Sequence, residues 1–384
     1  MRFVLYTVTP SPHQFPLAQK IVAQIGSSNF RYIYRHPLSE ERKRQGWRAE
    51  LPVWCISVQD PEALDWLLNA EFLLSGERDV ALFGRRSLVG RLSYYSSERW
   101  FKPWAGILRL LHPRYFGMAW RFVRLIRAKG VVYLPMGIWA ARDMARLVSL
   151  FSGDLRCLFR PPQLKYESQP GGLIDGYSWM RMWGYFVAPT SPFPAQESDD
   201  STGHGLRVLW VGRLLRLKSV DTLFKAVYAA NKVTPMTLTI VGEGPERKRL
   251  NRLDANLARR YGTDSRTTFH PSVPVNDIRL FMRNHDVYVL PSNAYEGWGA
   301  VVSEALEEKM EVFGSYEAGS SATILPDENL FHSGDWRELC NQLVRYAQTG
   351  ERHCHGIGSW CVDEAMDYLL NVVSYSLARK DRQE

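Results

Sequence analysis

The chain has 384 residues, which is enough for two domains of ordinary size. Apolar residues make up 45% of it and charged residues 23%, as is usual for a globular protein. The longest apolar run, residues 130–141, is too short for a membrane span and contains Pro135, so the composition excludes a transmembrane class.

Five scattered cysteines, an odd number, favour reduced thiols rather than a disulfide framework. The first residues are typical of a strand and lack the layout of a signal peptide. We therefore expect a cytoplasmic protein.

The net charge of +8 is unevenly distributed along the chain. Residues 1–200 contain 26 Lys and Arg against 17 Asp and Glu, whereas the remainder is nearly balanced. This asymmetry predicts an anionic partner for the first half.

The chain opens with an expected strand over residues 3–8, a loop that contains His13, and a helix with apolar residues at one-face spacing. Such a strand–loop–helix unit begins a doubly wound domain, in which ligands bind at the strand ends. His13 is therefore a candidate to face a ligand, although a loop histidine bonded to backbone fits the sequence equally well. Further apolar runs follow at residues 51–58, 71–74 and 80–83.

Residues 85–129 contain eleven basic residues, a single acid (Glu98) and many aromatic residues. This pattern suits an anionic membrane surface, nucleic acid, or sugars stacked on rings. No nucleic-acid-binding motif accompanies it, so we expect no nucleic acid and favour a membrane or a glycan. A solvated helix face over core aromatics is the alternative.

Glu98 lies alone among these positive charges, which keep it ionised. It is a candidate to orient an acceptor hydroxyl or to act as a base. The competing interpretation is a structural ion pair with Arg99 or another arginine.

The first half is expected to close with a strand at residues 131–135, a helix at 140–150 and a last strand at 184–189. Residues 196–205 are polar and rich in helix breakers, which is typical of an interdomain linker.

The second half opens with an expected strand at residues 207–211, followed by a loop that carries Arg213 and Lys218. A helix follows, with Ser219 or Asp221 expected to cap it. In strand–loop–helix units this loop binds diphosphate, for which a planar guanidinium and a compact ammonium are suitable partners.

The next unit is an expected strand ending at Gly242-Glu-Gly244-Pro245. A dinucleotide-binding fingerprint is excluded because no third glycine follows, and Pro245 fits the first position of a helix instead. His270 follows another short strand and is a candidate contact for a nucleotide base.

The last unit has a buried strand at residues 286–290, then Glu296-Gly297-Trp298-Gly299 and a helix that contains Glu304. A helix start offers unpaired amides to a phosphate, and the two glycines allow close approach. The carboxylates can accept hydrogen bonds from sugar hydroxyls. This stretch predicts a cradle for a sugar, a diphosphate and a ribose.

Together these motifs resemble the retaining glycosyltransferases of the two-Rossmann-domain (GT-B) type, family 4, also called glycosyl transferases group 1. The resemblance rests on the Glu-x7-Glu pair, on Gly212-Arg213-x4-Lys218, and on strand–Gly242-x-Gly244-Pro245–helix. It covers residues 206–335 well and the first half less well. Prolines replace the glycine-rich first turn of the family, Ser219 stands where glycine is commoner, and residues 308–313 replace its Gly-x-Pro segment.

The resemblance implies an α/β protein of two doubly wound domains facing a central cleft. We expect an acceptor domain at residues 1–195, a nucleotide-sugar domain at 206–360 and a terminal helix at 361–384 that crosses back to the first domain. His353-Cys354-His355 lacks enough suitable neighbours for a metal site, so we expect no metal.

The implied function is retaining transfer of a sugar from a UDP- or GDP-sugar to a hydroxyl of a glycan or lipid-linked acceptor, in cell-surface polysaccharide or glycoconjugate synthesis. Arg213, Lys218 and the amides of residues 297–299 would hold the diphosphate, Glu304 the ribose and Glu296 the sugar. Residues 85–129 would rest on the inner face of the membrane. A nucleotide-sugar epimerase of the same fold and a non-catalytic glycan- or lipid-binding protein are the alternatives.

Overall fold

The computed structural model describes residues 1–11, 13–44, 51–102, 106–153, 169–174, 176–187 and 205–380. They form two compact units: unit 1 comprises residues 1–188 with 359–384, and unit 2 comprises residues 189–358. The linker expected at residues 196–205 lies outside the described residues except for Gly205.

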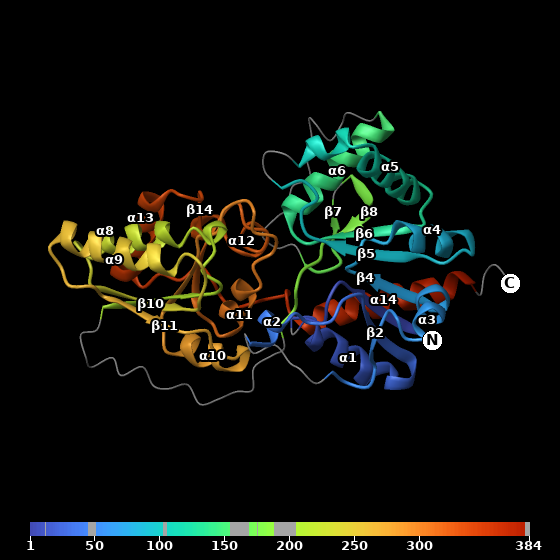
Figure 1. Cartoon of the computed structure of the whole chain (residues 1–384), viewed down its shortest axis with the longest axis horizontal. Coiled ribbons are helices and arrows are strands. Elements are labelled where there is room, and N and C mark those ends of the chain that lie inside the picture. The colour runs from blue at the N-terminus through green and yellow to red at the C-terminus, as the bar shows by residue number, and fades with distance from the viewer. Residues whose placement is uncertain are drawn as a thin grey trace. The chain divides into compact units, whose positions relative to one another are not determined.

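Unit 1 is built on an eight-stranded sheet in the order β3-β2-β1-β4-β5-β6-β8-β7 (Figure 1). All its pairings are parallel except that of β7 with β8. The strands are β1 Phe3–Thr7, β2 Phe30–Tyr34, β3 Cys55–Ser57, β4 Phe72–Ser75, β5 Ser93–Ser97, β6 Val131–Pro135, β7 Leu173–Ile174 and β8 Tyr177–Arg181.

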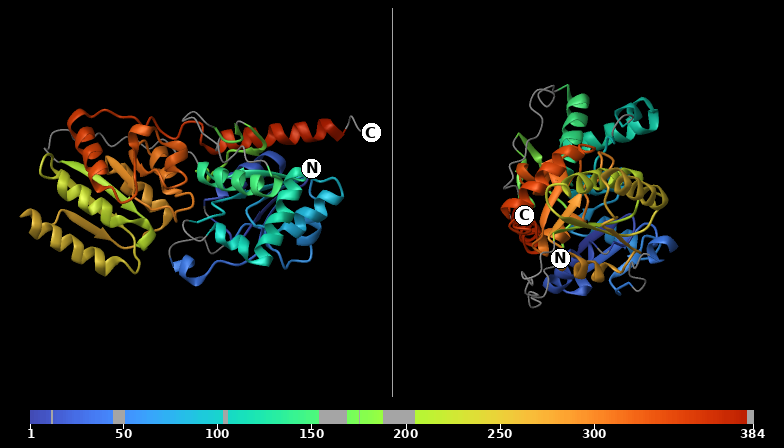
Figure 2. Two further views of the ribbon diagram at one scale, coloured as in Figure 1. Left: turned by 90° about the horizontal axis from the view of Figure 1, so that it is seen from above. Right: turned by 90° about the vertical axis from the view of Figure 1, so that its left-hand side faces the viewer.

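Helices cover both faces of this sheet (Figure 1). α3, α4, α5 and α6 contact one another in succession, and α14 packs along α1 with an ion pair between Lys20 and Asp363. Figure 2 shows α14, the last helix of the chain, from two further sides. The helices are α1 Phe15–Ile25, η1 Ser27–Asn29, α2 Glu40–Arg44, α3 Ala63–Asn69, α4 Val80–Leu88, η2 Ile107–Leu111, α5 Pro113–Arg127, α6 Ile138–Ser152 and α14 Val362–Lys380.

Unit 2 has a six-stranded parallel sheet in the order β11-β10-β9-β12-β13-β14. α8, α9 and α13 contribute to the core on one of its faces, and α10 lies across the sheet from them (Figure 1). The elements are β9 Leu206–Val211, η3 Arg216–Lys218, α8 Val220–Ala230, β10 Met236–Val241, α9 Arg247–Tyr261, β11 Thr267–His270, α10 Val275–Arg283, β12 Val287–Leu290, α11 Val301–Glu307, β13 Glu311–Ser315, α12 Ser321–Ile324, η4 Asp327–Asn329, β14 Leu330–Phe331 and α13 Trp336–Thr349.

The first six strands of each unit have the same relative order, 3-2-1-4-5-6. This is the doubly wound order in which a switch point lies between the first and fourth strands, and ligands bind at the carboxyl ends of the strands there. The α/β doubly wound class that the sequence predicts is therefore confirmed for both units.

Three local predictions are wrong. The described part of the expected strand at 184–189, residues 184–187, has no strand pairing, and the last strands of unit 1 are instead β7 and β8. α9 begins at Arg247, so Pro245 lies in the turn before it. Neither Ser219 nor Asp221 caps α8: Ser219 occupies the cap position but makes no side-chain hydrogen bond there.

The expected basic and aromatic surface at residues 85–129 is not one continuous surface. Five of its aromatic side chains are buried in the core of unit 1: Tyr94, Tyr95, Trp100, Phe101 and Phe122. Exposed residues of this stretch also occur at positions 85, 88–90 and 102, but most of those that the structure describes lie in η2 and α5. We call these two elements the η2–α5 surface.

Arg86, in the same basic stretch, is fully buried at 0% exposure. Its guanidinium donates to the carbonyls of residues 67, 68, 70 and 92 at 2.8–3.2 Å and to Ser93 Oγ at 3.1 Å. Burial lowers the pKa of Arg86 to about 10. The side chain thus satisfies the carbonyl end of α3 and the start of β5.

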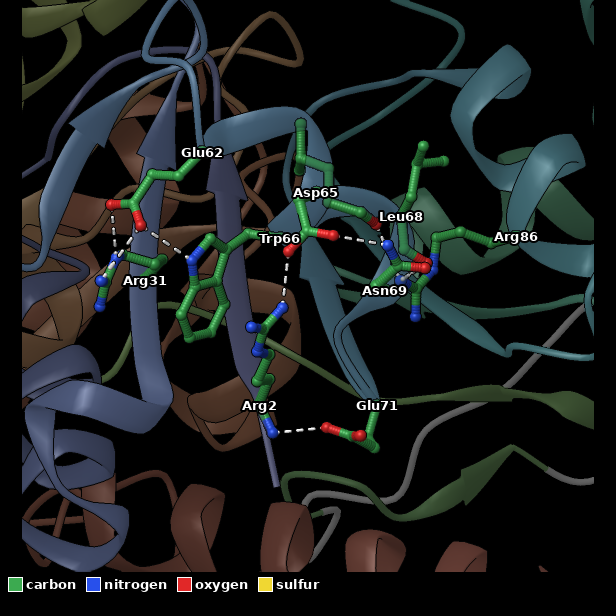
Figure 3. A network of polar contacts seen from close by, with 10 residues as sticks. Arg2, Arg31, Glu62, Asp65, Trp66, Leu68, Asn69, Glu71 and Arg86 are labelled. Carbon is green, nitrogen blue, oxygen red and sulfur yellow. Dashed lines mark hydrogen bonds and ion pairs between the residues drawn. The ribbon is translucent and has the colours of Figure 1, made fainter.

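Figure 3 shows Arg86 with a second polar cluster at this edge of unit 1. There the guanidinium groups of Arg2 and Arg31 lie over the ring of Trp66, at 4.7 and 4.6 Å from the ring centre. Asp65 holds Arg2 at 2.6 Å, and Glu62 holds Arg31 at 3.0 Å. Several arginines of the first half are therefore structural.

We predict that Arg86→Met lowers the free energy of unfolding by about 3–5 kcal/mol, because it leaves several buried carbonyls without donors. This corresponds to a drop of roughly 10 °C in the thermal midpoint, measured by calorimetry. Arg85→Met, at the exposed neighbouring position, is the control and should change the midpoint little. Equal midpoints for both variants would contradict the structural role of Arg86.

Candidate functional site

The candidate donor site lies at the carboxyl ends of β9 and β12, which are neighbours in the sheet of unit 2. Their pairing brings together two loops that are far apart in the sequence, residues 212–219 and 291–300. The amide of Asn293 donates to the carbonyl of Leu217 at 2.8 Å, so the loops are joined directly.

Lys218 and Glu296 form an ion pair across these loops, with Nζ 2.5 Å from Oε2. Their side chains are 19% and 12% exposed, so the pair is largely shielded from water. Ser292 Oγ donates to the same carboxylate at 2.8 Å. An ammonium has three donor hydrogens, so Lys218 can retain Glu296 and still donate to an anionic ligand.

The loop at residues 297–299 is fixed from one side by the segment after β13. The amides of Gly319 and Ser320 donate to the carbonyls of Gly297 and Trp298 at 3.1 and 2.8 Å, and Ser320 Oγ donates to Gly299. Gly299 has φ +89°, and a Cβ there would lie 2.7 Å from Leu290. Position 299 therefore requires glycine, and hydrogen bonds to the carbonyls of residues 297–299 hold this loop in place.

The helix that follows this loop, α11, has only seven residues. Its dipole is correspondingly small, so the expected anion cradle depends more on the loop amides and on nearby cations than on the helix. The ring of Trp298 is fully buried, which leaves only the backbone of this residue to contact a ligand.

Glu304 lies in the first turn of α11 and is 6% exposed. Burial, followed by the charges of Glu296 and Glu304, raises the pKa of the Tyr288 hydroxyl well above its ordinary value. Both carboxylates of the Glu-x7-Glu pair thus act on one buried phenol. Their acidic character is concentrated at the end of β12.

The loop after β9 presents Arg213 as an exposed side chain and Lys218 from the short η3 turn. Ser219 ends this turn in the left-handed region, with φ +48° and ψ +36°. This conformation explains why glycine is commoner at the position in the family that the loop resembles.

Gly242 and His270 also lie together, because the amide of Gly242 donates to the carbonyl of His270 at 3.1 Å. A Cβ on Gly242 would be 1.9 Å from the carbonyl oxygen of Gly212. Packing between two turns therefore requires this glycine. His270 packs edge-on against Phe281, with ring centres 5.0 Å apart.

Unit 1 has a cavity of about 590 Å³ at its own switch point, lined by residues that follow β1, β4 and β5. His13 and Glu98, the two candidates of the first half, both line it, with Tyr185. The rings of His13 and Tyr185 are 6.0 Å apart. The pKa of Tyr185 is raised by burial and by the charge of Glu98.

The ion pair of Glu98 with Arg99 or another arginine stays a prediction. Arg99 does have a buried carboxylate partner. This arginine pairs with Asp143 at 3.4 Å, and Asp143 also accepts from the amide of Phe101 at 2.9 Å. Asp143 is 1% exposed, and burial raises its pKa. The Arg99 pair therefore orders the chain after β5.

Arg42, Arg78 and Tyr185 also line the cavity, and sequence reasoning missed them as site residues. For Arg78, the available signal was its position just after the apolar residues 72–74, where a strand ends at the same sheet edge as His13. Arg42 and Tyr185 carried no such signal.

Within the described residues, no group of three or more His, Cys, Asp and Glu side chains is arranged to hold a metal ion. Among the helices of the same described residues, none is both long and apolar enough to cross a bilayer.

Comparison with known families gives a match over residues 197–353 to the family described as "Glycosyl transferases group 1". This part of the chain is similar to glycosyl transferases group 1, and we call it the group 1 domain. It contains the loops of Arg213, Lys218, Gly242 and Glu296, so the resemblance carried by these motifs is confirmed at the level of the family.

Solved structures similar to the whole chain show that this group 1 domain belongs to a protein of GT-B fold. HepE of Anabaena, solved in complex with UDP, has a TM-score of 0.66 and 14% identity, covering 98% of this chain and 100% of its own. The lipopolysaccharide outer core galactosyltransferase WaaB follows with 0.62 and 13%, covering 98% and 99%. The apo structure of OtsA has 0.56 and 13%, covering 97% and 96%. No curated protein sequence matches the chain.

We predict that Lys218 and Glu296 are energetically coupled within the group 1 domain. Lys218→Met and Glu296→Gln should each lower the free energy of unfolding by about 1–3 kcal/mol, because each leaves a shielded partner unpaired. The loss of unfolding free energy in the double variant should be smaller than the sum of the two single losses by about 1–2 kcal/mol, as measured by urea denaturation in a double-mutant cycle.

The matched control is Arg207–Asp286, a pair of the same domain that is 44% and 32% exposed. Its coupling should stay below about 1 kcal/mol, since water screens exposed pairs. Additive effects at Lys218 and Glu296 would show that their contact has no energetic weight.

Proposed function

We propose that this protein is a retaining glycosyltransferase of the family 4 type, which moves a sugar from a nucleotide diphosphate sugar to an acceptor hydroxyl. The observation that supports it most directly is the Lys218–Glu296 pair at the switch point of the group 1 domain. It places a cation suited to a diphosphate beside a carboxylate suited to a sugar.

The proposed diphosphate site consists of Arg213, Lys218 and the amides of residues 297–299. These groups neutralise the charge that develops on the leaving diphosphate as the bond to the sugar breaks. The two cations occupy the role that Mg²⁺ plays in other transferases, so we propose metal-independent transfer.

Glu296 is proposed to position the donor sugar and Glu304 to accept hydrogen bonds from the ribose. Gly242 and His270, at the ends of β10 and β11, would lie against the base. HepE was solved with UDP, which makes UDP-sugars the first donors to test, followed by GDP-sugars.

The acceptor is proposed to be a glycan or a lipid-linked sugar that binds in the unit 1 cavity, where His13 and Glu98 would orient its hydroxyl. In the family that the chain resembles, the leaving phosphate takes the proton of the incoming hydroxyl. No protein nucleophile is then required. A cavity with candidate hydroxyl partners favours transfer over epimerisation, which uses no acceptor.

The donor site can be tested with a panel of UDP-, GDP- and dTDP-sugars in a thermal-shift assay, since a ligand that binds the folded state raises its stability. We expect one nucleotide class to raise the midpoint and to be hydrolysed or transferred. A non-catalytic binding protein would release no nucleoside diphosphate.

For the active donor, Lys218→Ala and Arg213→Ala should each slow turnover at least tenfold, because a charge-assisted phosphate contact contributes about 1.5–3 kcal/mol. Lys225→Ala is the control, since this lysine pairs with Asp221 on α8. Normal turnover in both test variants would remove the assigned roles.

We also propose that the protein works in the cytoplasm, on the inner face of the membrane, in cell-surface polysaccharide synthesis. Support comes from the η2–α5 surface, whose large apolar side chains are exposed by 43–80%: Ile107, Leu108, Leu111, Phe116 and Trp120. Exposed arginines lie among them at positions 109, 114, 121, 124 and 127, and residues 99–142 contain no acid. Apolar insertion combined with basic charge is how peripheral proteins bind anionic lipid.

Liposome co-sedimentation tests this surface. The protein should bind vesicles that contain phosphatidylglycerol and should bind pure phosphatidylcholine vesicles only weakly. Leu108→Ser with Leu111→Ser should weaken binding roughly tenfold or more, because both leucines lose burial in the lipid. Val233→Ser removes an equally exposed apolar residue of unit 2 and should change nothing. Equal retention by both vesicle types would exclude this membrane contact.

A further inference from the structure

One arginine in the cavity of unit 1 is held, within the described residues, by neutral side chains alone. Arg78 follows β4 and lines the cavity. Its Nε donates to the Tyr95 hydroxyl at 3.1 Å, and its guanidinium lies 3.9 Å from the centre of the Trp100 ring. These contacts fix the orientation of the guanidinium without neutralising its charge.

Two other arginines at this end of the sheet have carboxylate partners. Arg35 pairs with Glu77 at 3.4 Å and with Asp79 at 3.2 Å. Arg99 pairs with the buried Asp143. Glu77 lines the cavity too, but its charge is directed to Arg35. Among Arg35, Arg78 and Arg99, the positive charge of Arg78 is therefore the one that no described carboxylate partner neutralises.

Glu98 supplies a carboxylate to the same cavity, from the loop after the adjacent strand β5. Its charge acts on Tyr185, whereas Arg78 is held by Tyr95 and Trp100. One cavity thus offers a guanidinium for an anionic group and a carboxylate for a hydroxyl. A partly buried guanidinium binds phosphate or carboxylate strongly because its donors form a planar fork.

We infer that the acceptor of this enzyme is a sugar that carries a phosphate or carboxylate group, and that Arg78 binds this group in the unit 1 cavity. The inference rests on the proposed glycosyltransferase function and names the chemical class of its acceptor. Glu98 binds a hydroxyl of the same molecule. Arg78 is a specificity-determining residue, because it separates charged acceptors from their neutral parents.

The test measures binding of acceptor probes to the full-length protein by calorimetry. The probes are the 6-phosphates of glucose, mannose, galactose and N-acetylglucosamine, with glucose 1-phosphate and glucuronate, each against its neutral parent sugar. We expect at least one charged probe to bind at least tenfold more tightly than its parent. In Arg78→Gln the ratio of the affinities for the charged probe and its neutral parent should fall close to one. In Arg78→Lys the ratio should be intermediate, since the charge remains and the planar fork is lost.

Three controls make the outcome decisive. Arg85→Gln removes an equal charge from an exposed position on α4 and should keep the preference. Thermal midpoints show whether each variant is folded. If Arg78→Gln is unfolded, Arg78→Lys supplies the test instead. Lys218→Ala should leave sugar-phosphate binding unchanged; if it abolishes binding while Arg78→Gln does not, the phosphate binds in unit 2 and the inference is wrong.

Binding of UDP, measured on the same samples, separates this inference from the proposed function. If UDP binds and no charged probe is preferred, the acceptor inference fails alone. If charged sugars bind through Arg78 and no nucleotide binds, the proposed function fails. A sugar linked through diphosphate to a polyprenyl chain, presented in detergent micelles, distinguishes the source: tighter binding than the free sugar phosphate indicates a lipid-borne acceptor, and weaker binding indicates a free one.

Discussion

The parallel pairing of β9 with β12 is the contact on which the candidate donor site depends. Val208 is opposite Val287 and Leu209 opposite Tyr288, in strands that β10 and β11 separate in the sequence. Parallel pairing between such distant segments requires crossover helices and a common apolar core. The core of unit 2 supplies it through buried side chains of β9, β12 and α8. Without this pairing, nothing would bring the loops of Lys218 and Glu296 into contact.

The first six strands of unit 1 have the same order, but the residues at their carboxyl ends differ in chemistry from those of unit 2. Its switch point holds a cavity with arginines, carboxylates, a histidine and a tyrosine, whereas the loops of unit 2 combine glycines, cations and two carboxylates. One topology thus carries two candidate sites that differ in the residues at the strand ends, although the sheet of unit 1 has two further strands. This division agrees with the sequence, in which the group 1 motifs are confined to the second half.

Much of this arrangement could be predicted from the sequence, because strands, helices and turn residues alternate in local patterns. The position of His13 beside a cavity followed from its place after a strand, whereas Glu98 was chosen as the single acid among basic residues. What failed depends on long-range packing. Arg86 reads as one cation of a basic stretch, and only the fold reveals that it is enclosed by carbonyls. The aromatic residues of that stretch divide between core and surface in the same way, as Tyr95 and Trp120 show.

Ser219 has a consequence for how firmly Lys218 is presented. A left-handed residue other than glycine is strained by about 1–2 kcal/mol, but serine also has fewer conformations than glycine in the unfolded chain. A turn with serine is therefore harder to form than one with glycine, but it has fewer accessible backbone conformations. The ammonium of Lys218, which we propose to hold a diphosphate, is then carried by a loop that needs little reorganisation, so less binding free energy is lost in ordering that loop.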